Sequence, residues 1–221
     1  MKIQRVKLVT EDNVEIIGNY FPSKIKNSPA VVLLHMMPAA KESWNDLAEK
    51  LKMAEFHCLA IDLRGHGESQ GGPDGFKNFS DEDHQSSIND VKAAVNFFTN
   101  QDIPLKRISL VGASIGANLC LQFQVEHPEI KAVVLLSPGL DYKGIATERL
   151  AKQLKGDQAF FMAAGGENDA YSSETVSKLF ALSKNQDNRM KILKNAGHGT
   201  TMFKEEPALM GEIVEWLKKL Y

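Results

Sequence analysis

The stretch Gly112-Ala113-Ser114-Ile115-Gly116 is the most informative part of this 221-residue chain. It follows the run Arg-Ile-Ser-Leu-Val at 107–111 and precedes an apolar helical pattern over 117–125. A serine flanked by small residues between a strand and a helix is the pattern of a nucleophile elbow, which presents the hydroxyl above a sheet. The same five residues are also compatible with an ordinary tight turn. The choice depends on whether an acid and a histidine follow at suitable places.

Both residue types follow Ser114, each after a predicted strand. Residues 160–164 are predicted to form a buried strand that leads through a glycine turn to Asp169. Residues 189–193 are predicted to form a last short strand, followed by Ala-Gly-His with the histidine at His198. Open α/β sheets place their sites at the carboxyl ends of strands, so the three side chains are expected at one edge. The order serine, acid, histidine is that of the α/β-hydrolases.

The remaining elements predict an α/β fold with a mostly parallel sheet of about eight strands and helices on both faces. Apolar runs that alternate with amphipathic helical segments favour parallel strands joined by right-handed crossovers. The predicted strands cover 3–9, 14–21, 30–35, 56–63, 108–111, 132–136, 160–164 and 189–193, and further helices cover 41–53, 86–99 and 205–220. We expect a single domain over 1–221, with a minimal cap around 141–158 that holds one helix near 145–154.

Composition excludes several classes of protein. The formal net charge of −2 gives no sign of nucleic-acid binding. Two cysteines, Cys58 and Cys120, are too few for a disulfide framework and lie in apolar segments, which predicts buried thiols. The first residues carry no signal-peptide pattern and no apolar run approaches a membrane span, so we predict a cytoplasmic protein. No cluster has metal-ligand spacing and no dinucleotide fingerprint is present, which predicts no metal and no cofactor.

On these residues the chain resembles the α/β-hydrolase superfamily over nearly its whole length. Two further motifs carry the resemblance: His35-Met36-Met37 stands where the family commonly has His-Gly-x, and 62–69 looks like its D-x-R-G-x-G-x-S loop. The compact size is similar to small serine esterases and to dienelactone-hydrolase-like members. That latter group typically uses a cysteine nucleophile, whereas this chain has Ser114.

The pattern of residues indicates acyl-transfer chemistry. A serine hydroxyl needs an adjacent base, so His198 would take the proton of Ser114 and later deliver it to the leaving group. Asp169 would hold the imidazole in the useful tautomer, with Glu167 and Asp187 as alternative acids.

The resemblance implies an oxyanion hole of two backbone N–H groups, from Ile115 and from the loop after His35. By alignment the second donor is Met37, with Met36 as the alternative. Met36 replaces the usual glycine, and its side chain is predicted to line the substrate pocket. His35 is expected to orient this loop rather than to react.

The reaction predicted from these features is hydrolysis of small acyl esters by a carboxylesterase through an acyl-enzyme on Ser114. The alternatives are a thioesterase, lipase, amidase or lactonase with the same three residues, and a non-catalytic ligand-binding protein of this fold. The expected partner is a small-molecule acyl ester. Neither a monomer nor a homodimer is favoured by the sequence.

Overall fold

The central sheet of the molecule is mainly parallel, as predicted. The computed structural model describes residues 2–183 and 185–221. Within them, the strands of this sheet are β1 (Gln4–Val9), β2 (Glu15–Phe21), β3 (Ala30–Leu34), β4 (His57–Ile61), β5 (Ile108–Ala113), β6 (Ala132–Leu136), β9 (Ala159–Ala164) and β10 (Arg189–Ile192). Their order across the sheet is β1-β2-β4-β3-β5-β6-β9-β10. β2 pairs antiparallel with β1 and β4, and the other neighbours are parallel.

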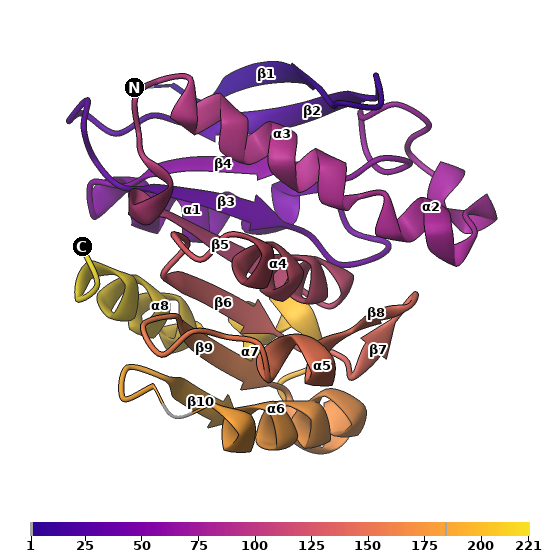
Figure 1. Cartoon of the computed structure of the whole chain (residues 1–221), viewed down its shortest axis with the longest axis vertical. Coiled ribbons are helices and arrows are strands. Elements are labelled where there is room, and N and C mark those ends of the chain that lie inside the picture. The colour runs from indigo at the N-terminus through magenta and orange to yellow at the C-terminus, as the bar shows by residue number, and fades with distance from the viewer. Residues whose placement is uncertain (1, 184) are drawn as a thin grey trace.

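Helices cover both faces of this sheet (Figure 1). The α-helices are α1 (Asn45–Met53), α2 (Asp81–Gln85), α3 (Ile88–Thr99), α4 (Ile115–Glu126), α5 (Thr147–Ala151), α6 (Ala170–Leu182), α7 (Met202–Glu205) and α8 (Ala208–Lys218). Short 3-10 turns are η1 (Lys41–Trp44), η2 (Gly75–Asn78), η3 (Leu105–Arg107), η4 (Gly166–Asp169) and η5 (Gly199–Thr201). In Figure 1, α3, α4, α5 and α6 lie in front of the sheet, and α1, α7 and α8 lie behind it.

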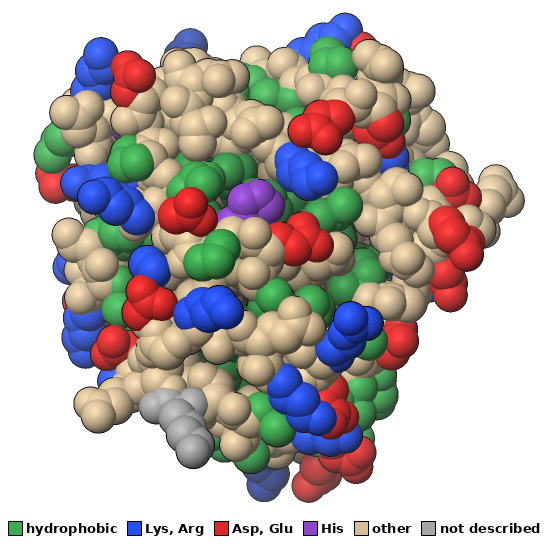
Figure 2. Space-filling model, viewed as in Figure 1, with side chains coloured by type: hydrophobic (Ala, Val, Ile, Leu, Met, Phe, Trp, Pro, Cys, Tyr) green, Lys and Arg blue, Asp and Glu red, His purple; other side chains and the backbone are tan. Residues whose placement is uncertain are grey.

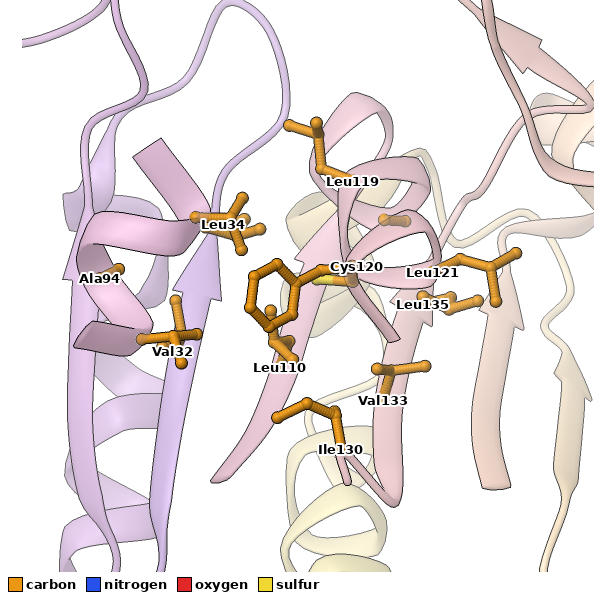
Figure 3. Packing of buried hydrophobic residues seen from close by; sticks show 14 of the residues in the cluster. Val32, Leu34, Ala94, Leu110, Leu119, Cys120, Leu121, Ile130, Val133 and Leu135 are labelled. Carbon is orange, nitrogen blue, oxygen red and sulfur yellow. The ribbon is translucent and has the colours of Figure 1, made fainter. Parts of the chain in front are cut away.

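The two faces of the sheet bury two separate apolar layers. Side chains alternate along a strand, so Val32 and Leu34 of β3 face one layer while Val31 and Leu33 face the other. Figure 3 shows the first layer, where strand residues meet Leu119 and its neighbours on α4. All five residues of β3 are buried, which explains why this strand is apolar without interruption.

The cap segment differs from the prediction of a helix over 145–154. The structure places a small hairpin there, formed by β7 (Asp141–Tyr142) and β8 (Ile145–Ala146), and only α5 is helical. Lys143 and Gly144 both have positive φ, 59° and 79°, which is the geometry of a two-residue hairpin turn. Asp141 Oδ1 accepts a hydrogen bond of 2.7 Å from the N–H of Gly144 and fixes this turn.

Two predicted helices are confirmed as α3 and α8, and each is slightly shorter than predicted and preceded by a short helix. Within 86–99, α3 begins at Ile88, and a turn at Ser86 and Ser87 separates it from α2. Ser80 caps α2 with a reciprocal hydrogen-bond pair to Asp83, a local signal that marks the earlier start. The segment 205–220 is interrupted after α7, and α8 begins only after Pro207.

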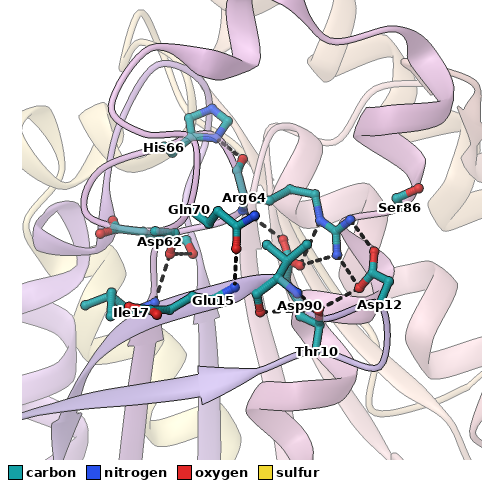
Figure 4. A network of polar contacts seen from close by, with 12 residues as sticks. Thr10, Asp12, Glu15, Ile17, Asp62, Arg64, His66, Gln70, Ser86 and Asp90 are labelled. Atoms are coloured by element: carbon teal, nitrogen blue, oxygen red, sulfur yellow. Dashed lines mark hydrogen bonds and ion pairs between the residues drawn. The ribbon is translucent and has the colours of Figure 1, made fainter.

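The loop after β4 is held by a buried polar network, shown in Figure 4. The guanidinium of Arg64 donates to Asp90 Oδ1 at 2.8 and 2.9 Å and to Asp12 Oδ2 at 2.6 Å. Ser69 Oγ donates to the carbonyl of Asp62 at 2.7 Å and accepts from the N–H of Ile17 at 2.9 Å. Arg64 therefore has a structural role in this loop.

The outer surface in Figure 2 carries interspersed basic and acidic side chains on the face that is visible there. This agrees with the nearly balanced charge of the chain. None of the helices in the described ranges is long and apolar enough to cross a membrane.

Candidate active site

Ser114 lies in the sharp turn between β5 and α4, at the carboxyl edge of the sheet. Its φ of 53° and ψ of −121° are strained for a residue with a side chain. A Cβ on Gly112 would collide with the backbone of Gly116, and one on Gly116 would lie 2.5 Å from the carbonyl oxygen of Leu34. The strand and the helix can therefore approach this closely only with glycine at both positions. This turn has the strained strand–turn–helix geometry that the sequence analysis expects around Ser114.

The loops after β9 and β10 bring an acid and a histidine together. Asp169 ends η4, and His198 directly precedes η5. The distance between His198 Nδ1 and Asp169 Oδ1 is 2.8 Å. Burial raises the pKa of Asp169, but the hydrogen bonds from His198 and Ser137 outweigh it and hold that pKa below its ordinary value. The carboxylate is therefore ionised at neutral pH, and Nδ1 of His198 carries the proton.

The two alternative acids lie apart from this pair. Glu167 and Asp187 are exposed, and neither carboxylate contacts His198 among the described residues. The backbone carbonyl of Asp187 instead accepts a hydrogen bond from the indole of Trp216 at 2.8 Å. The structure therefore brings Asp169, and not its two competitors, to the histidine.

A further residue of the site, Ser137, follows β6 and was not predicted from the sequence. It is fully buried with a φ of 50°. Its Oγ donates to Asp169 Oδ2 at 2.6 Å and accepts from the N–H of Gly199 at 2.7 Å. Ser137 therefore links the acid to the loop that carries His198. The only sequence signal was its place directly after a buried strand, in the same position as the other candidates.

Ser114 and His198 lie on adjoining loops. A Cβ on Gly199, the residue after His198, would lie 3.2 Å from the Cβ of Ala113, the residue before Ser114. Within the described ranges, however, Ser114 Oγ makes no hydrogen bond to the imidazole. Such contacts are often long in a free site and shorten when substrate binds. The side chain of His198 is 37% exposed, so a small molecule can reach it.

The two backbone donors predicted for an oxyanion hole have no partner in the part of the chain that the structure describes. The N–H of Met37, in the loop after β3, and that of Ile115, the first residue of α4, donate to no protein acceptor. The side chain of Met36 reaches the loop after His198, where a Cβ on Gly199 would lie 2.5 Å from its sulfur. The side chain of Met36 therefore lies against Gly199, the residue that follows His198.

His35 holds the loop after β3 by both ring nitrogens. The N–H of Leu63 donates to His35 Nε2 at 3.0 Å, so Nδ1 carries the proton and donates to the carbonyl of Met36 at 3.0 Å. Burial is the main cause that lowers the pKa of His35 to about 4, with a contribution from His66. His35 is therefore neutral at physiological pH and orients the loop, as we expected.

No group of three or more histidine, cysteine or acidic residues suited to a metal ion occurs in 2–183 or 185–221. Cys58 and Cys120 are free and buried, and burial raises the pKa of both thiols. Neither cysteine is therefore an activated nucleophile.

The fold and this site define an α/β-hydrolase. A family model described as the alpha/beta hydrolase fold matches residues 29–202, and the chain belongs to this family. Among solved structures, it is similar to the esterase Pf2001 of Pyrococcus furiosus, with a TM-score of 0.80 and 21% identity over 99% of this chain and 91% of that one. It is also similar to the esterase RhEst1 of Rhodococcus sp. ECU1013, with a TM-score of 0.78 and 15% identity over the whole of both chains. At these identities the likeness concerns the fold alone.

Two curated relatives match part of the sequence. A putative 2-succinyl-6-hydroxy-2,4-cyclohexadiene-1-carboxylate synthase of Bacillus subtilis (strain 168) is 32% identical over 58% of this chain and 44% of its own length. The monoacylglycerol lipase abhd6-B of Xenopus laevis is 30% identical over 58% of this chain and 36% of its own length. The chain thus spans less than half the length of these curated relatives.

Proposed function

We propose that the protein is a serine hydrolase that cleaves small acyl esters. The observation that carries this proposal is the 2.8 Å contact between His198 and Asp169 on loops that adjoin the strained elbow of Ser114. Because Nδ1 of His198 donates to Asp169, Nε2 is left as the acceptor that a general base needs. Ser114 is the nucleophile, His198 the base and then the acid, and Asp169 the residue that orients the imidazole.

The reaction proceeds in two halves. The proton of Ser114 Oγ passes to His198 Nε2 as Oγ bonds to the ester carbonyl carbon, and the carbonyl oxygen becomes negatively charged. The N–H groups of Met37 and Ile115 stabilise that charge, and losing one such donor typically costs about 3–4 kcal/mol. The bond to the alcohol then breaks as His198 protonates the departing oxygen. Water, deprotonated by His198, repeats the sequence and releases the acid from Ser114.

The size of the cap supports small substrates. The segment 141–158 contains two strands of two residues each and the five-residue helix α5. Such a segment offers little apolar surface for a long acyl chain. Relatives with this fold include proteins named as esterases, a lipase and a synthase, so the family does not by itself decide the acyl group.

A fluorophosphonate probe tests the nucleophile. We expect the native protein and Ser177→Ala, a change at an exposed serine of α6, to be labelled, and Ser114→Ala to remain unlabelled. In parallel, acetate, butyrate, octanoate and palmitate esters of one chromogenic alcohol should be hydrolysed with a preference for the short chains. Thioester, anilide and lactone substrates test the alternative reactions. Folded native protein that takes no label and hydrolyses none of these substrates would favour a ligand-binding role.

A further inference from the structure

The hairpin β7–β8 presents an aromatic side chain, Tyr142, at the carboxyl edge of the sheet, where Figure 1 shows this hairpin. The ring centroids of Tyr142 and His198 are 6.5 Å apart at an interplanar angle of 83°, so the tyrosine stands edge-on to the imidazole. The hydroxyl of Tyr142 lies 3.2 Å from Ser172 Oγ. Burial raises the pKa of Tyr142, and hydrogen bonding with the Ser172 and Ser114 side chains opposes that rise. The phenol is therefore neutral at physiological pH.

The base of this hairpin is fixed to α4, the helix behind Ser114. The side-chain amide of Asn118, which is fully buried, donates to the carbonyls of Gly139 at 3.0 Å and Ile145 at 2.8 Å. Its oxygen accepts from the N–H of Gly139 at 3.1 Å. One side chain thus holds both ends of the hairpin to the helix that follows the nucleophile.

The side and tip of the hairpin are also held. The hydroxyl of Tyr171 accepts from the N–H of Asp141 at 3.0 Å and donates to its carbonyl at 3.3 Å. The side chain of Gln85 donates to the carbonyl of Lys143 at 3.0 Å. Hydrogen bonds hold the hairpin at its base, side and tip. Its backbone is therefore constrained, and the position of the Tyr142 ring is defined.

We propose that Tyr142 is the residue that limits the size of the substrate, because its fixed ring occupies space beside His198 and Ser114 that a longer acyl chain would need. This inference rests on the proposed function and adds the element of the fold that sets chain-length selectivity. The contact with Ser172 holds the ring in place, whereas the volume of the ring causes the selectivity. Tyr142 is thus a specificity-determining residue and takes no part in proton transfer.

The test is the ratio of kcat/KM for octanoate to that for acetate in variants of the full chain. We expect Tyr142→Ala to raise this ratio at least tenfold, because each methylene that gains a buried position contributes roughly fourfold. Tyr142→Phe keeps the ring and should change the ratio by less than about threefold. Tyr221→Phe is the matched control, because it also removes a tyrosine–serine hydroxyl contact, the 2.7 Å pair with Ser109, and should leave the ratio unchanged.

A variant with a larger side chain at position 142 tests the same inference without relying on the folding of Tyr142→Ala. Tyr142→Trp enlarges the ring and should lower the ratio of butyrate to acetate at least threefold, and Tyr142→Leu replaces Tyr142→Ala if the latter does not fold. Tyr142→Ala that is labelled by the fluorophosphonate like the native protein, yet keeps the native chain-length ratio, would overturn the inference alone. Native protein that is neither labelled nor active on esters would overturn the proposed function first and the inference with it.

Discussion

Replacing Ser137 by alanine removes the side chain that connects Asp169 to the loop of His198. Asp169 Oδ2 would lose its 2.6 Å hydrogen bond and keep the weaker one from the N–H of Gly165 at 3.3 Å. The N–H of Gly199 would lose its acceptor at 2.7 Å in a buried position. The carboxylate of Asp169 and the backbone of Gly199, which both border His198, would therefore be less constrained. None of the atoms proposed to react is altered.

The size of this effect follows from the two hydrogen bonds that alanine cannot make. A hydrogen bond to a charged group contributes about 1.5–3 kcal/mol, and an unpaired buried N–H costs about 1–3 kcal/mol. We expect Ser137→Ala to lower the free energy of unfolding by about 3 kcal/mol. If the hydrogen bond to Asp169 serves to position that carboxylate, its removal should lower kcat/KM by roughly ten- to a hundredfold.

The pH profile separates positioning from general stability. Hydrogen bonds from His198 and Ser137 lower the pKa of Asp169, so removing Ser137 must raise that pKa. Carbon-13 NMR of the Asp169 carboxyl group should therefore show its protonation at higher pH in Ser137→Ala than in the native protein. Ser109→Ala is the control, because Ser109 is equally buried and its hydroxyl pairs with Tyr221, away from the candidate site. A native kcat/KM together with an unchanged pKa of Asp169 in Ser137→Ala would contradict this role of Ser137.

Three further outcomes are expected. Asp169→Asn should lower kcat by about four orders of magnitude, because the amide no longer holds the imidazole of His198 in the useful tautomer. Glu167→Gln is the control and should leave kcat within about twofold of the native value. Equal losses of kcat in steady-state assays would contradict the assignment of Asp169. The folded pKa of His35, about 4, lies below the unfolded value of about 6.5, so stability is complete above pH 6.5 and falls by about 3 kcal/mol towards pH 4. Urea unfolding of His35→Gln should show a correspondingly flatter pH dependence, and an unchanged slope would count against it. Gly116→Ala should destabilise by about 1–3 kcal/mol because of a backbone oxygen 2.5 Å from the new Cβ, whereas Gly211→Ala, with open space around it in α8, should stabilise by roughly 0.5–1 kcal/mol in thermal unfolding.

The chain itself carries strong local signals for the sheet and for the three loops of the candidate site. A strand buried on both faces must be apolar throughout, so β3 and β6 are visible in the sequence as uninterrupted apolar runs. Because parallel strands end at one edge, residues directly after them are expected to meet there. This reasoning places Ser114, Asp169 and His198 near one another without any knowledge of distances.

The prediction from local sequence was wrong in the cap segment, where contacts with residues distant in the sequence determine the conformation. Residues 145–154 have a helical pattern, yet Ile145 pairs with Tyr142 in a hairpin, and Asn118 holds it from another helix. The hydrogen bond from the buried amide of Asn118 to Ile145 spans 27 residues, so the residue pattern of 145–154 does not indicate it. Hydrophobic periodicity therefore could not predict the hairpin that presents Tyr142 to the site.

The α/β architecture, the strained serine turn and the three strand ends could be predicted from the residues alone, because these features depend on apolar runs and on glycines within a few residues. The choice of the acid that contacts His198, and of the further groups that hold this acid, depends on the three-dimensional packing of the chain. Asp169 contacts a partner 29 residues away, and Ser137 contacts partners 32 and 62 residues away. Hydrogen bonds of this kind depend on directions and distances between loops, which are set by how the whole sheet is packed and not by the residues next to each partner.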